Sequence, residues 1–220
     1  MIQKWLQEKG LENNRASEKI EAYSDLLIKE KKIRNIVGVR DRDSLVEKHI
    51  IPSMELAMII KEKRGVDIGS GNGLPGIVIA LMKPDISMIL IEPKISRVNF
   101  LNMVVRKLCP GRVDIICMRS EDAGKCPEYR EKYDFATCRA VADLIISAEL
   151  VLPLLTVGGC YYAQVGSSVR EKTQKAASHI NILGGVTADQ ILPDIALIQK
   201  KYPTPADFPR SWKRISAKNS

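Results

Sequence analysis

The sequence lacks the features that mark a membrane protein, a disulfide-bonded protein or a metal-binding protein. No stretch approaches the roughly 18 consecutive apolar residues of a membrane-spanning helix, and the first residues, MIQKWLQEKGLENNR, contain no apolar secretory signal. The five cysteines are odd in number and no two form a C-x-x-C pair, and the only histidines are His49 and His179. We therefore expect reduced cysteines, no metal, no membrane contact and a cytoplasmic location.

Acidic residues are too few to balance the basic ones. The chain has 34 Lys and Arg against 26 Asp and Glu, a formal net charge of +8, which favours a polyanionic partner such as RNA. Basic residues gather between Lys200 and Lys218, interleaved with Phe208 and Trp212, and an exposed aromatic ring among cations can stack on an unpaired base. The candidate RNA contacts of this segment are Arg210, Lys213, Arg214 and Lys218.

Three prolines in the same segment, Pro203, Pro205 and Pro209, predict an extended chain rather than a helix, because proline removes a backbone donor. An extended, basic segment could follow a phosphate backbone. The alternative is that the segment packs at the edge of a sheet and its charges are only solvated.

The spacing of apolar residues predicts helices followed by an alternation of strands and helices. Helical spacing covers 17–34 and a second stretch from about residue 43, interrupted or restarted near Pro52. From Gly65 onward the alternation predicts a parallel sheet covered on both faces. We expect strands at 65–69, 87–92, 113–118, 133–138 and 160–165, and helices at 74–82, 95–108, 143–155 and 169–182. The expected organisation is an N-terminal helical segment (1–62), a main α/β domain (63–200) and a basic C-terminal segment (201–220).

The stretch VDIGSGNGLPG follows the first of these strands and has four glycines in eight positions. Glycine at this density indicates close approach of a ligand to the backbone. Two cofactors fit: a dinucleotide bound by G-x-G-x-x-G, or S-adenosylmethionine bound by D-x-G-x-G-x-G from Asp67. Asp67 favours S-adenosylmethionine, because it can face a methionine ammonium but would oppose a pyrophosphate. Glu92, at the end of the next strand, can bind the ribose of either cofactor.

Several segments resemble one enzyme family. They are DIGSGNGLPGIVIALMKPD, IEPKISRVNFLNMVV, RSE at 119–121 and CRAV at 138–141, with NIVGVRDRDSLVEKHIIPS upstream and KKYPTPADFPR downstream. Together they resemble the ribosomal RNA small subunit methyltransferase G family, also called glucose-inhibited division protein B, over most of the chain. The resemblance implies a class I S-adenosylmethionine-dependent methyltransferase of Rossmann-like fold, acting on guanine N7 of small-subunit ribosomal RNA. It also implies ribosomal RNA or an assembling 30S particle as the partner. We expect the protein to be a monomer.

The resemblance also implies roles for individual residues. Arg139 corresponds to an arginine that faces the cofactor and the reaction site, and we expect it to act in catalysis. His49 lies in a segment that resembles the family's histidine segment and is a candidate RNA contact or a plain surface histidine. The candidate cofactor-binding residues are Asp67, Gly69, Ser70, Gly71, Gly73, Leu74, Glu92, Ser120, Glu121 and Arg139.

The sequence departs from the family after the fifth expected strand, where Val165-Gly166 replaces the usual Lys-Gly pair. This removes a positive charge near the substrate. Guanine N7 has a free lone pair, so its methylation needs orientation and exclusion of water but no general base. The alternatives that stay open are a methyltransferase of this fold with another RNA or small-molecule acceptor, and a non-catalytic RNA-binding protein.

Overall fold

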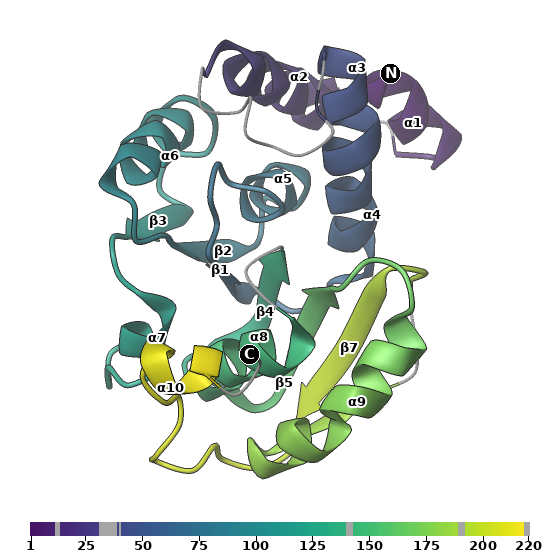
Figure 1. Ribbon diagram of the computed structural model, residues 1–220. Coiled ribbons are helices and arrows are strands. Elements are labelled where there is room, and N and C mark those ends of the chain that lie inside the picture. Colours follow the sequence, from purple (N-terminus) through teal and green to yellow (C-terminus); the bar gives the residue numbers. More distant parts are fainter. Residues whose placement is uncertain (12–13, 31–38, 40, 140–142, 189–191, 218–220) are drawn as a thin grey trace.

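A seven-stranded sheet forms the centre of the protein in this computed structural model, which describes residues 1–220 except 12–13, 31–38, 40, 140–142, 189–191 and 218–220. The strand order is β3-β2-β1-β4-β5-β7-β6, with β1 to β5 parallel and β7 antiparallel to both β5 and β6 (Figure 1). The expectation of a mostly parallel α/β sheet is confirmed. The strands are β1 (Arg64–Ile68), β2 (Ser87–Ile91), β3 (Val113–Ile116), β4 (Tyr133–Arg139), β5 (Leu155–Gln164), β6 (Gly185–Thr187) and β7 (Ile195–Lys200).

Helices cover both faces of the sheet, because alternate residues of each strand enter two separate cores. On β4, for example, Phe135 belongs to one core, and Ala136 and Cys138 belong to the other. The first core is completed by α1 (Ile2–Glu8), α2 (Asn14–Lys29), α3 (Arg42–Leu45), the π-helix η2 (Val46–Ile50), α4 (Ile51–Ile59), α5 (Gly76–Met82) and α6 (Ile95–Leu108). The second is completed by α7 (Ser120–Ala123), α8 (Leu144–Val151), the 3-10 helix η3 (Leu152–Leu154) and α9 (Val169–Ile182).

The N-terminal helices share their core with the sheet. Ile20, Tyr23 and Leu27 of α2 are fully buried, and they belong to one cluster with Leu90 and Phe135 of the strands. These helices therefore form one wall of the domain. This wall reaches the loop after β1, where the Tyr23 hydroxyl donates a hydrogen bond of 2.7 Å to the carbonyl of Asn72.

The expected second helix runs through Pro52 without a break. A π-turn, η2, precedes α4, and Pro52 occupies the first turn of α4, a position that tolerates proline. The π-turn is where His49 lies, and such turns are frequent at functional sites.

The expectation that the C-terminal segment is extended rather than helical is wrong in one place. β7 is an extended strand that ends at Lys200, but Trp212–Ser216 form the short helix α10, which begins only after the last proline of the segment. Ile215 of α10 packs against Ile146 and Leu150 of α8.

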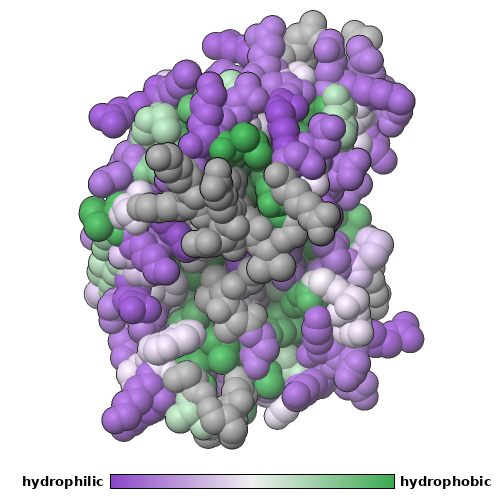
Figure 2. All heavy atoms as spheres, turned by 45° about the horizontal axis from the view of Figure 1, so that its top comes forward, coloured by the Kyte–Doolittle hydropathy of each residue, from purple (hydrophilic) through white to green (hydrophobic). Residues whose placement is uncertain are grey.

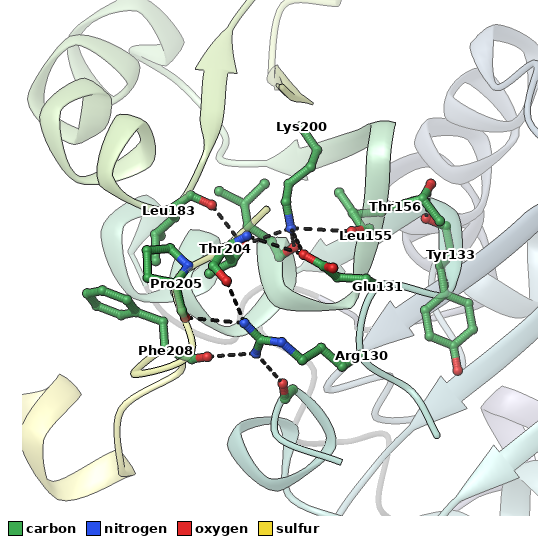
Figure 3. Close-up of polar contacts among 12 residues, drawn as sticks. Arg130, Glu131, Tyr133, Leu155, Thr156, Leu183, Lys200, Thr204, Pro205 and Phe208 are labelled. Carbon is green, nitrogen blue, oxygen red and sulfur yellow. Dashed lines mark hydrogen bonds and ion pairs between the residues drawn. The ribbon is translucent and has the colours of Figure 1, made fainter. Parts of the chain in front are cut away.

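The chain between β7 and α10 is fastened to the body by buried polar contacts (Figure 3). Lys200 is fully buried, and its ammonium donates hydrogen bonds to the carbonyl of Leu152 at 2.6 Å and the hydroxyl of Thr204 at 2.7 Å. The Arg130 guanidinium donates to the carbonyls of Thr204 and Phe208, each at 2.7 Å. Lys200 is thus a structural residue and not a free cation.

Hydrophilic residues cover most of the face shown in Figure 2, and hydrophobic residues gather near its middle. Among the described residues, no helix is long and apolar enough to cross a membrane.

Candidate active site

A cleft of about 550 Å³ lies at the carboxyl edge of the parallel strands, the edge where open α/β sheets bind their ligands. One wall is the loop after β1, which contributes Gly69, Ser70, Gly71 and Leu74. The other wall comes from the ends of β4 and β5 and from the π-helix. It includes His49, Arg139 and Gln164.

The loop after β1 has the backbone that its glycines predict. Gly69, Gly71 and Gly73 have φ values of +62°, +59° and +99°, which favour glycine. A Cβ on Gly73 would lie 2.5 Å from Ile77 Cγ1 and 2.9 Å from the Tyr23 hydroxyl, whereas a Cβ on Gly71 would have no neighbour nearer than 3.7 Å. Gly73 is therefore required by packing, and Gly71 leaves the cleft side of the loop open.

Asp67 lies on β1 beneath this loop and is almost fully buried. Its Oδ1 accepts a hydrogen bond of 2.7 Å from the Thr137 hydroxyl, and its Oδ2 accepts one of 3.3 Å from the N–H of Gly76. Burial raises the pKa of Asp67 to about 6, although these hydrogen bonds and the charge of Arg139 act against the rise. A cationic ligand group beside it would favour the charged carboxylate.

Glu92 follows β2 and is also buried. Its two carboxylate oxygens accept hydrogen bonds of 2.9 Å from the backbone N–H groups of Gly71 and Lys94. The Arg97 guanidinium lies 3.5 Å from Glu92 Oε2. The carboxylate is thereby fixed against the glycine loop, where it can accept hydrogen bonds from ligand hydroxyls.

Arg139 ends β4 and reaches into the cleft. Burial lowers the pKa of its guanidinium, while Tyr23 and Asp67 act in the opposite direction. Within the described part of the chain, no oxygen accepts a hydrogen bond from this guanidinium. A charged group held in this way is available to a ligand.

Two buried polar atoms in the cleft wall have no hydrogen-bond partner among the described residues: His49 Nε2 and Gln164 Oε1. Buried polar atoms are rarely left without a partner. Burial, helped by Arg139 and Lys48, lowers the pKa of His49 to about 4, so the imidazole is neutral at pH 7. Both atoms therefore point to a polar ligand.

Ser120 and Glu121 begin α7, directly after β3, and β3 is the neighbour of β2. Ser120 is buried, and Glu121 is half-buried. The residues that line the cleft include neither of them. Their expected contact with the adenine stays a prediction.

The structure gives Arg210 a protein partner in place of the expected RNA contact. Its guanidinium donates to both oxygens of the fully buried Glu149, at 2.8 and 2.6 Å. Burial alone would raise the pKa of Glu149, but hydrogen bonds from His179 and Arg210 lower it to about 2. Phe208 is likewise occupied, since its ring packs edge-on against His179 at 6.0 Å.

The other expected RNA contacts of the C-terminal segment have different positions. Lys213 and Arg214 are exposed on α10, and Lys218 lies outside the described residues. In the described ranges, no group of three or more His, Cys, Asp or Glu side chains could hold a metal ion.

Sequence reasoning missed several residues of the site, among them Tyr23, Arg97 and Gln164. In the sequence, Tyr23 belongs only to an apolar helical stripe, and Arg97 only to a helix. Gln164 ends the strand beside β4, so its position relative to Arg139 is the available signal.

Comparison with known proteins agrees with this geometry. The family model described as GidB, rRNA small subunit methyltransferase G, matches residues 16–191. A relative from Acetivibrio thermocellus, named ribosomal RNA small subunit methyltransferase G, is 33% identical over 204 residues, covering 88% of this chain and 84% of its own.

Solved structures share the fold. Fibrillarin from Aeropyrum pernix, with natively bound S-adenosyl-L-methionine, aligns with a TM-score of 0.52 and 16% identity, covering 67% of this chain and 72% of its own. TYW2 from M. jannaschii, in complex with AdoMet, aligns with the same TM-score and identity over 68% of this chain and 72% of its own.

Proposed function

Since this chain belongs to the rRNA small subunit methyltransferase G family, we propose that it methylates guanine N7 of small-subunit ribosomal RNA with S-adenosylmethionine. The observation that carries the proposal is the constellation at the sheet edge: two buried carboxylates, an open glycine loop and a guanidinium without a protein acceptor among the described residues. These groups lie side by side along one edge of the sheet.

The residues present fit S-adenosylmethionine. Glu92 is buried and fixed beside the loop, where it would bind the ribose hydroxyls. Asp67 would face the methionine ammonium. Burial raises the pKa of its carboxyl, and the positive charge of the ligand would favour the ionised carboxylate. Gly71 leaves the loop bare on the cleft side.

When bound, the cofactor supplies an electrophilic methyl group on a sulfonium, and its transfer to N7 breaks the C–S bond without releasing a proton. The protein therefore needs to orient the base and exclude water. We infer that Arg139 donates hydrogen bonds to the methyl acceptor beside the cofactor. We infer that His49, neutral at pH 7, contacts the RNA from the same wall of the cleft as Arg139.

The basic character of the chain supports RNA as the substrate. Lys48 lies on the cleft wall, and Lys213 and Arg214 are exposed on α10. We infer that these residues contact phosphates, that the enzyme acts as a monomer in the cytoplasm, and that its substrate is small-subunit RNA or an assembling 30S particle. A non-catalytic RNA-binding role would not require the buried carboxylates at the cofactor edge.

A transfer assay tests the proposal. Purified protein is incubated with methyl-labelled S-adenosylmethionine and either small or large ribosomal subunits from bacteria that lack the corresponding modification. Label is expected in RNA of the small subunit. Equal labelling of both subunits, or label in protein alone, would contradict the proposal.

A further inference from the structure

We propose that a second cavity, next to the cofactor cleft, receives the acceptor guanine nucleotide turned out of the RNA. Gln164 would hold its base, and Lys172 and Lys175 its phosphate. This inference rests on the proposed function and adds to it the site at which the base is recognised.

The order of groups along the sheet edge sets the direction from which the acceptor approaches. Glu92, Asp67, Arg139 and Gln164 belong to the ends of β2, β1, β4 and β5, which are consecutive in the sheet. Neighbouring strands lie about 4.8 Å apart. Because Glu92 and Asp67 would bind the cofactor, the methyl-accepting base would approach from the side of β4 and β5.

A cavity of about 630 Å³ lies on that side, within the range of roughly 300–1,000 Å³ that small-molecule sites occupy. It shares Arg139, Gln164 and Gly166 with the cofactor cleft. Leu144 and Val165 add apolar surface to its lining, suited to the face of a purine ring. A base in this cavity would meet the cofactor cleft at Arg139.

Gln164 stands at the junction of the two cavities. It is the register partner of Arg139 in the parallel pair β4–β5, so the two side chains lie side by side on one face of the sheet. Gln164 Oε1 is buried and has no hydrogen-bond partner in the described chain. Guanine has N–H donors on the edge away from N7, whereas adenine has an unprotonated ring nitrogen there. A hydrogen-bond acceptor at this position, such as Gln164 Oε1, therefore favours guanine over adenine.

Two lysines of α9 supply positive charge to the same cavity. Lys172 Nζ donates a hydrogen bond of 2.6 Å to the carbonyl of Val165, and Lys175 lies one turn later. Two carboxylates also line the cavity: Asp143, which caps α8 through the N–H of Ile146, and the exposed Glu171. The lysine ammonium groups lie where a nucleotide phosphate can be bound. Enzymes that modify bases commonly turn the nucleotide out in this way.

Single-turnover methyl transfer tests the role of Gln164, with small-subunit particles and saturating S-adenosylmethionine. Gln164→Leu should lower the maximal rate constant about 10- to 100-fold, because a base donor is left without its acceptor. Gln164→Glu keeps an acceptor and should stay within about fivefold of the wild type. Cofactor affinity, measured by calorimetry, should be the same in all three proteins.

The lysines are tested by titrating the RNA. Lys172→Gln/Lys175→Gln should raise the half-saturating RNA concentration at least about fivefold and leave the maximal rate constant unchanged. Arg106→Gln/Lys107→Gln removes two exposed cations of α6 outside both cavities and serves as the charge-matched control. The inference is overturned if Gln164→Leu matches the wild type, or if both double variants behave alike.

A binding measurement separates this inference from the proposed function. Isotope-labelled protein saturated with S-adenosylhomocysteine is titrated with GMP or AMP. The amide resonances of Gly166 and Lys172 should shift with GMP and much less with AMP. Equal shifts, or none, overturn the cavity assignment even if the enzyme methylates RNA. Selective shifts without transfer to RNA would overturn the proposed function alone.

Discussion

The hydroxyl of Thr137 donates a hydrogen bond of 2.7 Å to Oδ1 of Asp67, and it joins two neighbouring strands beneath the cofactor loop. Asp67 is nevertheless a destabilising charge in the free protein, because burial raises its pKa from 3.8 to about 6. As the pH rises through this range, the unfolded carboxyl ionises first and folded stability falls. The decrease is complete above about pH 6 and amounts to about 3 kcal/mol.

Asp67→Asn removes this ionisation. The melting temperature of the variant minus that of the wild type should be larger at pH 7.5 than at pH 4.5. The variant should also bind S-adenosylmethionine at least about tenfold more weakly, because the cofactor ammonium no longer meets a charged partner. Thermal denaturation at the two pH values and calorimetry measure both effects. The assignment fails if the melting difference does not depend on pH and cofactor affinity is unchanged.

Two glycines of one loop should respond differently to alanine. Gly71→Ala should cost about 1–2 kcal/mol of unfolding free energy, from the left-handed backbone alone. Gly73→Ala should cost more than about 3 kcal/mol, because its Cβ would also collide with Ile77 and Tyr23. Urea denaturation measures this difference. Similar values for the two variants would contradict the packing of α2 on the loop.

A larger residue at the open position should remove cofactor binding without unfolding the protein. Gly71→Val should keep a cooperative melting transition but show no increase in melting temperature with S-adenosylmethionine, which stabilises the wild type as any ligand of the native state does. Stabilisation of the wild type by NADH instead would mean that the loop binds a dinucleotide.

The basic residues of the C-terminal segment should separate into structural and RNA-binding groups. Arg210→Ala leaves the buried Glu149 without its bidentate partner and should cost about 3 kcal/mol of stability. Urea denaturation measures that cost. If Arg210→Ala has the same free energy of unfolding as the wild type, the ion pair of Arg210 with Glu149 does not stabilise the fold.

Lys213→Gln/Arg214→Gln should leave stability unchanged and flatten the plot of log RNA affinity against log salt by about 1.4, which is about 0.7 for each phosphate that the variant no longer neutralises. RNA affinity measured over a range of salt concentrations gives the slope. Parallel plots for the double variant and the wild type would mean that α10 does not bind phosphate.

The rate of methyl transfer should not depend on a titrating base. With cofactor and RNA saturating, the single-turnover rate constant should be nearly flat between about pH 6.5 and 8.5, and Arg139→Ala should lower it. Rapid-quench measurements across this range are sufficient. A log-linear rise with pH would indicate a base and another acceptor atom, and an unchanged rate in Arg139→Ala would remove Arg139 from the site.

The sequence predicts the elements whose periodicity is local. α9 has the expected bounds, and all five expected parallel strands form. The antiparallel part of the sheet is harder to predict because β7 ends in Lys200. In the sequence Lys200 belongs to the basic C-terminal segment, although it is fully buried. Its charge is accommodated by Thr204 and by carbonyls that only the folded chain brings together.

The candidate site follows the same division. Asp67, Gly71 and Glu92 lie in motifs whose spacing carries the chemistry, and the structure joins both carboxylates to the glycine loop, Glu92 through the N–H of Gly71 and Asp67 through the N–H of Gly76. The partner of Arg210 is 61 positions away in the chain, and no pattern in the C-terminal segment indicates it. Gln164 is not predicted because its significance is a buried oxygen without a partner in the described chain, which becomes visible only when the surrounding atoms are placed.

The central claim is tested most directly by mass mapping of small-subunit ribosomal RNA after incubation with the enzyme and S-adenosylmethionine. Nuclease fragments of treated and untreated particles are compared, and each methylated nucleoside is identified against standards. The account predicts a new N7-methylguanosine at one position, which is absent when Arg139→Ala replaces the wild type. A methyl group on an exocyclic amine, on a pyrimidine or on a ribose, or no new methyl group at all, would contradict it.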